Sequence, residues 1–97
     1  MSRSRVDAEE VLGSRGRVRV LVVLAGSGEL NISEVSRRTG LNYTSVERHL
    51  ARLSELGLVG EKRYGKIRIF RVLFEALTLR LERGGGLTME MTADGGD

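Results

Sequence analysis

A helix-turn-helix pattern in the middle of the chain constrains the fold more than any other sequence feature. Ser33 is a candidate N-cap for a helix over residues 34–39. Gly40 follows that helix at the position where a positive φ is cheap only for glycine. Asn42 is a candidate N-cap for a longer helix over residues 43–56. The pattern therefore predicts two helices joined by one tight turn.

The two predicted helices carry the residues that a close crossing requires. Ser36 is small enough for the crossing point, and Val46 can anchor the second helix. An apolar stripe at helical spacing continues from Val46 through Leu50, Leu53 and Leu56. The first turn of the second helix is then free to project. In the helix-turn-helix motif this second helix enters the major groove of DNA.

The residues before this pattern contain one clear helix and one ambiguous segment. Residues 6–12 are predicted as a short helix with Asp7 as its N-cap. Residues 17–25 include four valines, which favour a strand, but the apolar run is also long enough for a buried helix. Periodicity does not separate these two interpretations. Residues 30–32 are expected to form a short strand.

A basic β-hairpin is predicted after the second helix, with strands over residues 58–64 and 67–72. Cations on the second strand alternate with Ile67 and Ile69, which gives a basic and an apolar face over its middle. Five cations stand against one acid in this hairpin: Lys62, Arg63, Lys66, Arg68 and Arg71 against Glu61. A net charge of +4 is a candidate phosphate-binding patch, and a solvated surface strand is the alternative.

Residues 73–83 are predicted as a final amphipathic helix with two apolar stripes. A single small core needs only one of these stripes, so we expect the second stripe to pack against the same helix of a second copy. Alternatively, the second stripe covers the first helix of the same chain. The expected dimer residues are Leu73, Phe74, Leu77 and Leu81. The predicted fold class is α+β, mainly helical, with a small antiparallel β-hairpin and a C-terminal dimerisation helix.

Length and charge divide the 97-residue chain into one domain with two tails. The longest apolar run has six residues, whereas a membrane helix needs about 20, so a soluble cytoplasmic protein is expected. The net charge of +3 separates into +6 over residues 1–83 and −3 beyond them. We predict a flexible basic arm over 1–5, a folded domain over 6–83 and a flexible Gly-rich acidic tail over 84–97.

Three segments resemble winged helix-turn-helix transcription regulators of the arsenic-repressor-like (ArsR) group and its archaeal relatives. Residues 41–59 look like the recognition helix of that group. Residues 12–21 are similar to its helix entry, and residues 62–71 resemble its basic wing. The resemblance covers roughly residues 8–80. It implies that residues 17–25 are helical and that the hairpin is the wing.

The resemblance also implies a set of DNA-facing residues. Thr44 and Ser45 can contact a base or a phosphate, and Arg48 can bind guanine or a phosphate. An acid near phosphates costs affinity, so Glu47 needs another partner. It could accept a hydrogen bond from the N4 amino group of cytosine, or it could pair with Arg48 or Arg52. Wing cations would add salt-dependent affinity. The expected set is Asn42, Tyr43, Thr44, Ser45, Glu47, Arg48 and Arg52 on the helix, and Lys62, Arg63, Lys66 and Arg68 on the wing.

No metal or other cofactor is expected. Classical members of the resembled group sense metals through cysteine-rich or carboxylate–histidine sites. This chain has no cysteine, and its predicted last helix has no histidine. The single histidine, His49, is two residues from Glu47, so the two side chains point apart on a helix. We expect His49 to be a packing or phosphate-contacting residue.

The sequence predicts a transcriptional regulator that binds double-stranded DNA as a homodimer, and not an enzyme or a membrane protein. No nucleophile is paired with a base, and no strand precedes the glycine run at 84–86. One alternative is an architectural chromatin protein of weak specificity. Another is a winged-helix module that binds protein and not DNA. The acidic tail could compete with DNA for the basic face, or it could be a disordered end.

Overall fold

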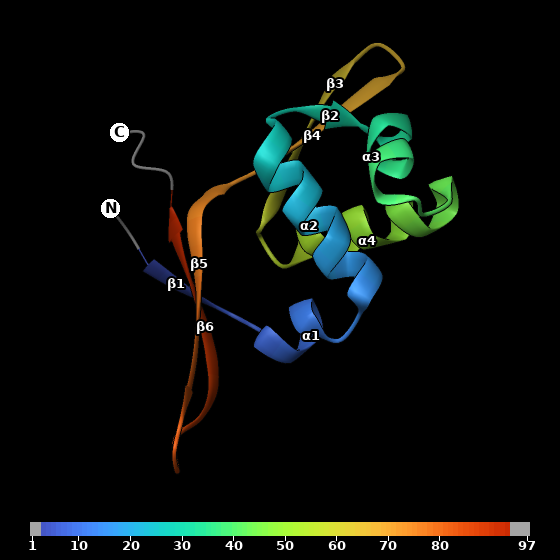
Figure 1. Cartoon of the computed structure of the whole chain (residues 1–97). Helices are drawn as coiled ribbons and strands as arrows, with labels where there is room; N and C mark the ends of the chain where they lie inside the picture. The colour runs from blue at the N-terminus through green and yellow to red at the C-terminus, as the bar shows by residue number, and fades with distance from the viewer. Residues whose placement is uncertain (1–2, 94–97) are drawn as a thin grey trace.

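The computed structural model describes residues 3–93 and has two parts, a winged-helix body and a three-stranded sheet beside it (Figure 1). The body contains α1 (Ala8–Leu12), α2 (Arg15–Ser27), β2 (Leu30–Asn31), α3 (Ile32–Thr39), α4 (Tyr43–Glu55), β3 (Val59–Tyr64) and β4 (Ile67–Val72). The second sheet, called the C-terminal sheet below, contains β1 (Arg3–Val6), β5 (Phe74–Glu82) and β6 (Gly86–Ala93).

Side-chain caps set the ends of the two helices of the helix-turn-helix. The Asn42 carboxamide oxygen accepts from the backbone N–H of Ser45 at 2.8 Å, so α4 begins where the sequence predicts. Gly40 ends α3 with φ of +78°, as expected. The predicted cap at Ser33 is wrong, because Asn31 caps α3 and forms a reciprocal capping box with Glu34.

The ambiguous valine-rich segment is helical, as the family resemblance implies. It lies in α2, and the Ser14 hydroxyl caps the helix by accepting from the backbone N–H of Arg17. Val20, Leu21 and Leu24 on one side of α2 are buried. Packing against α3 and α4 therefore outweighs the β-propensity of the valines.

The wing is an antiparallel hairpin of β3 and β4, extended on one side by β2. Lys62 pairs with Ile69 across the hairpin, and Leu30 of β2 pairs with Phe70 of β4. Gly65 takes φ of +65° in the turn, which matches the predicted strand boundaries. Phe70 is buried and joins the sheet to the helices. The innermost residues of this shared core include Val20, Leu24, Val35, Val46, Leu50, Leu53 and Leu58.

The predicted C-terminal dimerisation helix is wrong, because residues 74–82 form strand β5. β5 turns back through the glycine run into β6, and β1 pairs with the far edge of β6. Apolar residues at positions 77, 79 and 81 alternate with polar ones, which is the two-residue period of a strand. Strands hold nearly as many residues as helices, so "mainly helical" is also wrong.

The expected flexible ends contain strands as well. β1 (Arg3–Val6) takes in residues 3–5 of the expected basic arm and Val6 of the predicted first helix, which begins at Ala8 instead. β6 (Gly86–Ala93) lies within the expected acidic tail. Residues 1–2 of the arm and 94–97 of the tail lie outside the described residues. Within residues 3–93, no helix is long and apolar enough to cross a membrane.

Candidate nucleic-acid interface

The first turn of α4 presents polar side chains on the surface of the body. Tyr43, Thr44 and Arg48 are exposed, while Val46 and Leu50 on the opposite side of the helix are fully buried. The buried side anchors α4 in the core, so the exposed side is held rigidly. This is the arrangement that the sequence predicts for the second helix of the motif.

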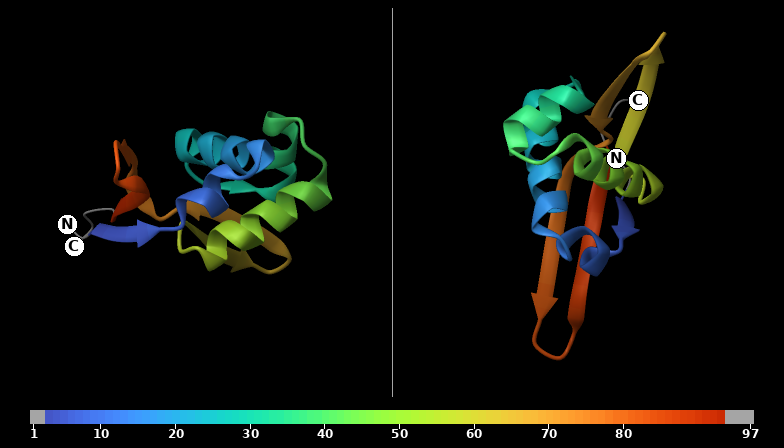
Figure 2. Two further views of the ribbon diagram at one scale, coloured as in Figure 1. Left: turned by 90° about the horizontal axis from the view of Figure 1, so that it is seen from below. Right: turned by 90° about the vertical axis from the view of Figure 1, so that its right-hand side faces the viewer.

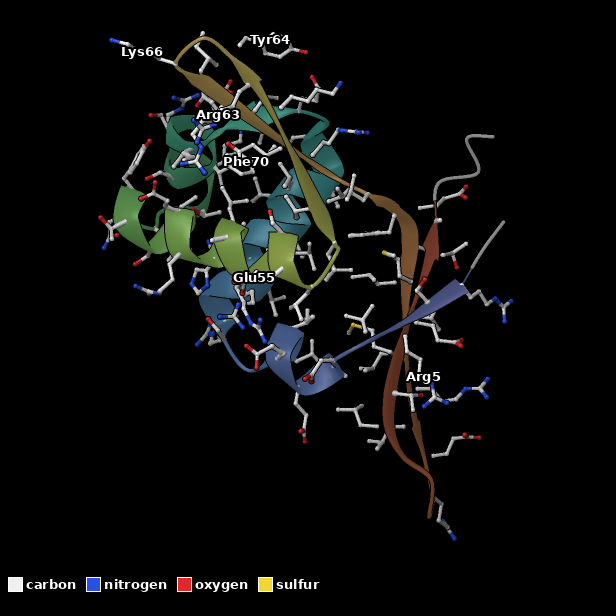
Figure 3. The ribbon with its side chains drawn as sticks, turned by 180° about the vertical axis from the view of Figure 1, so that it is seen from behind. Arg5, Glu55, Arg63, Tyr64, Lys66 and Phe70 are labelled. Carbon is white, nitrogen blue, oxygen red and sulfur yellow. The ribbon has the colours of Figure 1, made fainter. Side chains whose placement is uncertain are left out.

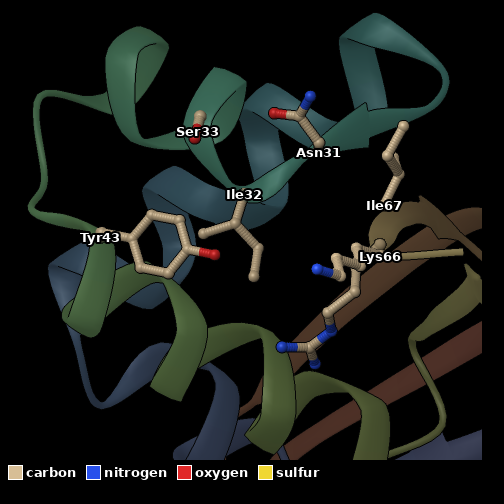
Figure 4. Close-up of a pocket in the computed structure, with 7 residues that line it drawn as sticks. Asn31, Ile32, Ser33, Tyr43, Lys66 and Ile67 are labelled. Atoms are coloured by element: carbon tan, nitrogen blue, oxygen red, sulfur yellow. The ribbon is translucent and has the colours of Figure 1, made fainter.

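A hollow of about 190 Å³ lies where the starts of α3 and α4 meet the wing (Figure 4). Tyr43 lines it from α4, and Lys66 and Arg68 line it from the wing. Asn31, Ile32 and Ser33 complete the wall from the α3 side. The hollow brings together cationic and hydroxyl groups, which are the groups that contact phosphates in protein–DNA interfaces.

Arg68 is held in place by three neighbours. Its guanidinium donates to Glu61 at 2.6 Å and to Glu47 at 3.0 Å, and it lies 5.3 Å from the centre of the Phe70 ring. The hydrogen bond from Arg68 lowers the pKa of Glu61, and Glu61 in turn raises the pKa of Arg68. Glu47 therefore pairs with the wing and not with Arg48 or Arg52, and this contact fixes the wing relative to α4.

Ion pairs also involve two other predicted wing cations. The Lys62 ammonium lies 3.3 Å from a carboxylate oxygen of Glu29, and Arg63 lies 3.3 Å from Glu61. Glu29 pairs with Lys62, and Glu47 of α4 pairs with Arg68. When these two carboxylates are counted with the hairpin, its net charge falls from +4 to +2. Lys66, near the wing tip in Figure 3, has no carboxylate within 4.0 Å in the described part of the chain.

Arg52, which the sequence groups with the DNA-facing residues, lies in a different cluster. Its guanidinium contacts Glu10 at 2.7 Å and Glu55 at 3.0 Å. Glu10 also pairs with Arg17 at 3.3 Å, so one carboxylate links α1, α2 and α4. The hydrogen bond from Arg52 is the main cause that lowers the pKa of Glu10. The structure places Arg52 in a clamp between helices and not beside the hollow.

His49 is buried in α4 and packs against the first turn of α2. A Cβ atom added at Gly16 would lie 2.9 Å from its Nε2 atom, so the glycine makes room for the ring. Burial lowers the pKa of His49, and Arg17 and Arg48 lower it further. Its Nδ1 atom is buried without a hydrogen-bond partner. These contacts support the packing interpretation of His49.

Sequence reasoning missed the contribution of the α3 start to this surface. Ser33 was expected to cap the helix, but its side chain is exposed and lines the hollow. The signal for the correct cap was present, because Asn31 and Glu34 have the spacing of a capping box. Because Asn31 caps α3, the Ser33 hydroxyl is not needed as the cap.

The four expected dimer residues do not share one helical face. Leu73 lies between β4 and β5, against Gly60 at the base of the wing. Phe74 and Leu77 are partly buried against the core, whereas Leu81 is 76% exposed near the end of β5. Among residues 3–93, no group of three metal-ligating side chains comes together.

The comparisons agree with this geometry. Residues 14–61 match the family described as bacterial regulatory proteins of the arsR family. The HTH-type transcriptional regulator YgaV of Escherichia coli (strain K12) is 31% identical over 61 residues. Those residues are 63% of this chain, and the match spans 62% of the length of YgaV.

Solved structures give the same fold. A predicted DNA-binding transcriptional regulator from E. coli has a TM-score of 0.63 at 26% identity, with 70% of this chain and 72% of the other covered. A homodimeric winged helix-turn-helix DNA-binding domain from Mycobacterium bovis has a TM-score of 0.58 at 30% identity, with 65% and 57% covered.

The class of protein follows from the fold and these matches together. The body is a winged helix-turn-helix domain of the kind found in transcription regulators. The findings support an ArsR-like transcription regulator, and the matched family and relatives are regulators and not enzymes. The matched family and the organisms named here are bacterial, whereas the sequence resemblance had included archaeal relatives.

Proposed function

We propose that this protein is a transcriptional regulator that binds specific sequences of double-stranded DNA as a homodimer. The exposed first turn of α4, anchored by a fully buried opposite side, carries the proposal. In this arrangement α4 enters the major groove, where Arg48 and Thr44 can read base edges. The M. bovis relative that is described as homodimeric supports two copies addressing two half-sites.

The hollow beside α4 would receive the DNA backbone. The Lys66 ammonium, the Tyr43 hydroxyl and the exposed Ser33 hydroxyl surround it, and each can donate to a phosphate oxygen. Arg68 lines the same hollow, but Glu47 and Glu61 already hold it. Arg68 thus acts as a positioning residue that sets the distance between wing and α4, and Lys66 supplies the free charge.

The paired wing cations argue against an architectural protein that binds through charge alone. With a net charge of +2 around the hairpin, non-specific phosphate attraction is weaker than the sequence count implies. Affinity then depends more on base contacts from α4. The protein-interaction alternative gives no role to the exposed polar groups of the first turn of α4, which can hydrogen-bond to DNA.

Selection from a random pool of DNA duplexes tests the proposal. The expected result is a palindromic consensus that binds at least a thousandfold more tightly than random duplex at the same salt concentration. Equal affinity for consensus and random duplex would favour the architectural protein. No binding even at low salt would favour the protein-interaction module.

A further inference from the structure

The C-terminal sheet has one apolar face and one polar face. Two cross-strand pairs, Leu79–Met89 and Leu81–Leu87, lie on the apolar face, and Val6 of β1 stands beside Met89 in the same row. The neighbouring positions on β5, β6 and β1 place threonine, arginine and glutamate on the opposite face. A sheet with this pattern buries one face against an apolar surface.

The body covers only part of that apolar face. Met89 is 4% exposed, because the sheet packs against α1 along β6. Leu79, directly opposite Met89 on β5, is 51% exposed. Leu81 and Leu87 toward the hairpin turn are exposed too. The cover reaches Leu77 on β5 and Met89 on β6 and ends there, and the far part of the hairpin extends beyond the body (Figures 1 and 2).

β5 is also an edge strand. The sheet order is β1-β6-β5, so the nine residues of β5 have a strand partner on one side only in the described chain. The unpaired N–H and C=O groups of such an edge are a template for another strand. A long edge next to exposed leucines is the combination that isolated monomers usually avoid.

A second open apolar surface lies on α2. Val22 is 65% exposed, and with Leu12 and Val18 it lines a shallow hollow of about 330 Å³. Arg15 and Arg19 flank this hollow. Both views in Figure 2 place α2 and β5 on the same side of the molecule.

Both of these open surfaces are apolar. The charged residues Arg80, Glu82 and Glu90 of the hairpin lie on the other, polar face of the sheet, so they do not interfere with contacts made by Leu79 and Leu81. The α2 hollow is lined by apolar side chains between two arginines. A protein that displays two open apolar surfaces on one side can cover both by meeting a second copy of itself.

We propose that two copies pair through β5, antiparallel about a two-fold axis, and form a continuous six-stranded sheet. Such an axis keeps the apolar faces of both sheets on the same side. It also brings the hairpin turn of one copy beside the beginning of β5 in the other copy. Leu79 and Leu81 then cover the α2 hollow of the partner, which holds Val22. The proposal rests on the homodimer of the proposed function and identifies the surface that forms it.

The first test measures the solution mass of the protein without DNA, by sedimentation over a range of concentrations. Leu79→Lys puts a charge on the apolar face, and Thr88→Lys puts the same charge on the polar face of the central strand β6, away from the β5 edge. We expect the wild type and Thr88→Lys to dimerise, and Leu79→Lys to dimerise at least tenfold more weakly while keeping its circular dichroism. A monomeric wild type, or a Leu79→Lys dimer of unchanged strength, would overturn the proposal.

A second test does not depend on a destabilising substitution. The chain has no cysteine, so single cysteines can be introduced in turn over residues 76–80 of β5. Two antiparallel copies of β5 bring one of these positions against itself, and oxidation should join the two chains there. Glu90→Cys, on the central strand β6, is the matched control and should not cross-link. Cross-linking at Glu90→Cys and at no β5 position would contradict the β5 interface. Both tests omit DNA, so their failure is separate from a failure to bind an operator.

Discussion

The winged-helix body and the C-terminal sheet bury their apolar side chains to different extents. In the body, Val46, Leu50 and Leu53 of α4 are completely covered, and its exposed face is polar except for the Tyr43 ring. In the sheet, Leu79 and Leu81 belong to an apolar face that is covered as far as Leu77 and Met89 and open toward the hairpin turn. The difference indicates that α4 is fully packed in one copy of the chain, whereas in our proposal the sheet is completed by a second copy.

Their ion pairs differ in the same way. In the body, Glu10 contacts Arg17 and Arg52, and Glu61 contacts Arg63 and Arg68, so single carboxylates tie several elements together. The described part of the C-terminal sheet contains one ion pair, between two residues of β5 at 3.9 Å. Ion pairs thus connect several elements of the winged-helix body and add little to the sheet.

The comparison is tested most severely by removing apolar side chains from each region. Leu50→Ala should lower the free energy of unfolding by about 2–5 kcal/mol, because it leaves a cavity in a closed core. Leu81→Ala should change it by no more than about 0.5 kcal/mol at concentrations where the protein is monomeric. Urea denaturation measures both values.

Protein concentration sharpens this test. Where the protein dimerises, Leu81→Ala should become more costly, because the side chain is then covered, while the effect of Leu50→Ala should stay the same. A Leu81→Ala variant as unstable as Leu50→Ala at low concentration would mean that the sheet is already packed in the monomer.

Arg48→Ala should weaken binding to the selected operator by about 1–3 kcal/mol if Arg48 reads a base. The side chain is exposed, so the free energy of unfolding should not change. Fluorescence anisotropy with the operator and with a scrambled duplex measures the loss of specificity. An equal loss on both duplexes would show that Arg48 contacts only phosphate.

Lys66→Gln should reduce the salt dependence of DNA binding, lowering the slope of log K against log salt by about 0.9. Lys62→Gln is the matched control, and it should change the slope less because Glu29 already neutralises Lys62. Titrations at several salt concentrations give both slopes. Equal slopes for wild type and Lys66→Gln would show that Lys66 does not contact a DNA phosphate.

The smallest expected effect is a pH dependence of stability in the body. Because burial lowers the pKa of His49, the unfolded chain takes up a proton near pH 6.5 while the folded chain does not. Stability should therefore fall as the pH drops through 6.5 toward the lower folded pKa. His49→Gln should flatten this dependence between about pH 7 and pH 5.5, since His49 is the single histidine.

Thermal unfolding at several pH values gives the measurement. The pKa values of Glu10 and Glu61 are lowered from their ordinary value of 4.5. The stability that these two carboxylates contribute is therefore lost only as the pH falls below about 4.5, outside the range in which His49 titrates. A His49→Gln variant with the same pH dependence as wild type would mean that folding does not change the pKa of His49.

Local features of the sequence determined the helix-turn-helix and the wing. Asn42 caps α4, Gly40 ends α3, and Gly65 turns the hairpin, and each acts on backbone groups within a few residues. Such signals are independent of the rest of the chain, so they can be recognised before the structure is known. The side of α4 that becomes buried followed from its apolar spacing for the same reason.

The tertiary structure alone decided the state of residues 74–82 and the pairing of the site charges. Leu77 and Leu81 fit a helical spacing, whereas Leu77, Leu79 and Leu81 together fit the two-residue period of a strand, and pairing with β6 decides between them. Arg52 meets Glu10, 42 residues away, and Arg68 meets Glu47, 21 residues away. Counting charges along a sequence does not show which of them pair, because these ion pairs form between side chains that only the folded backbone brings together.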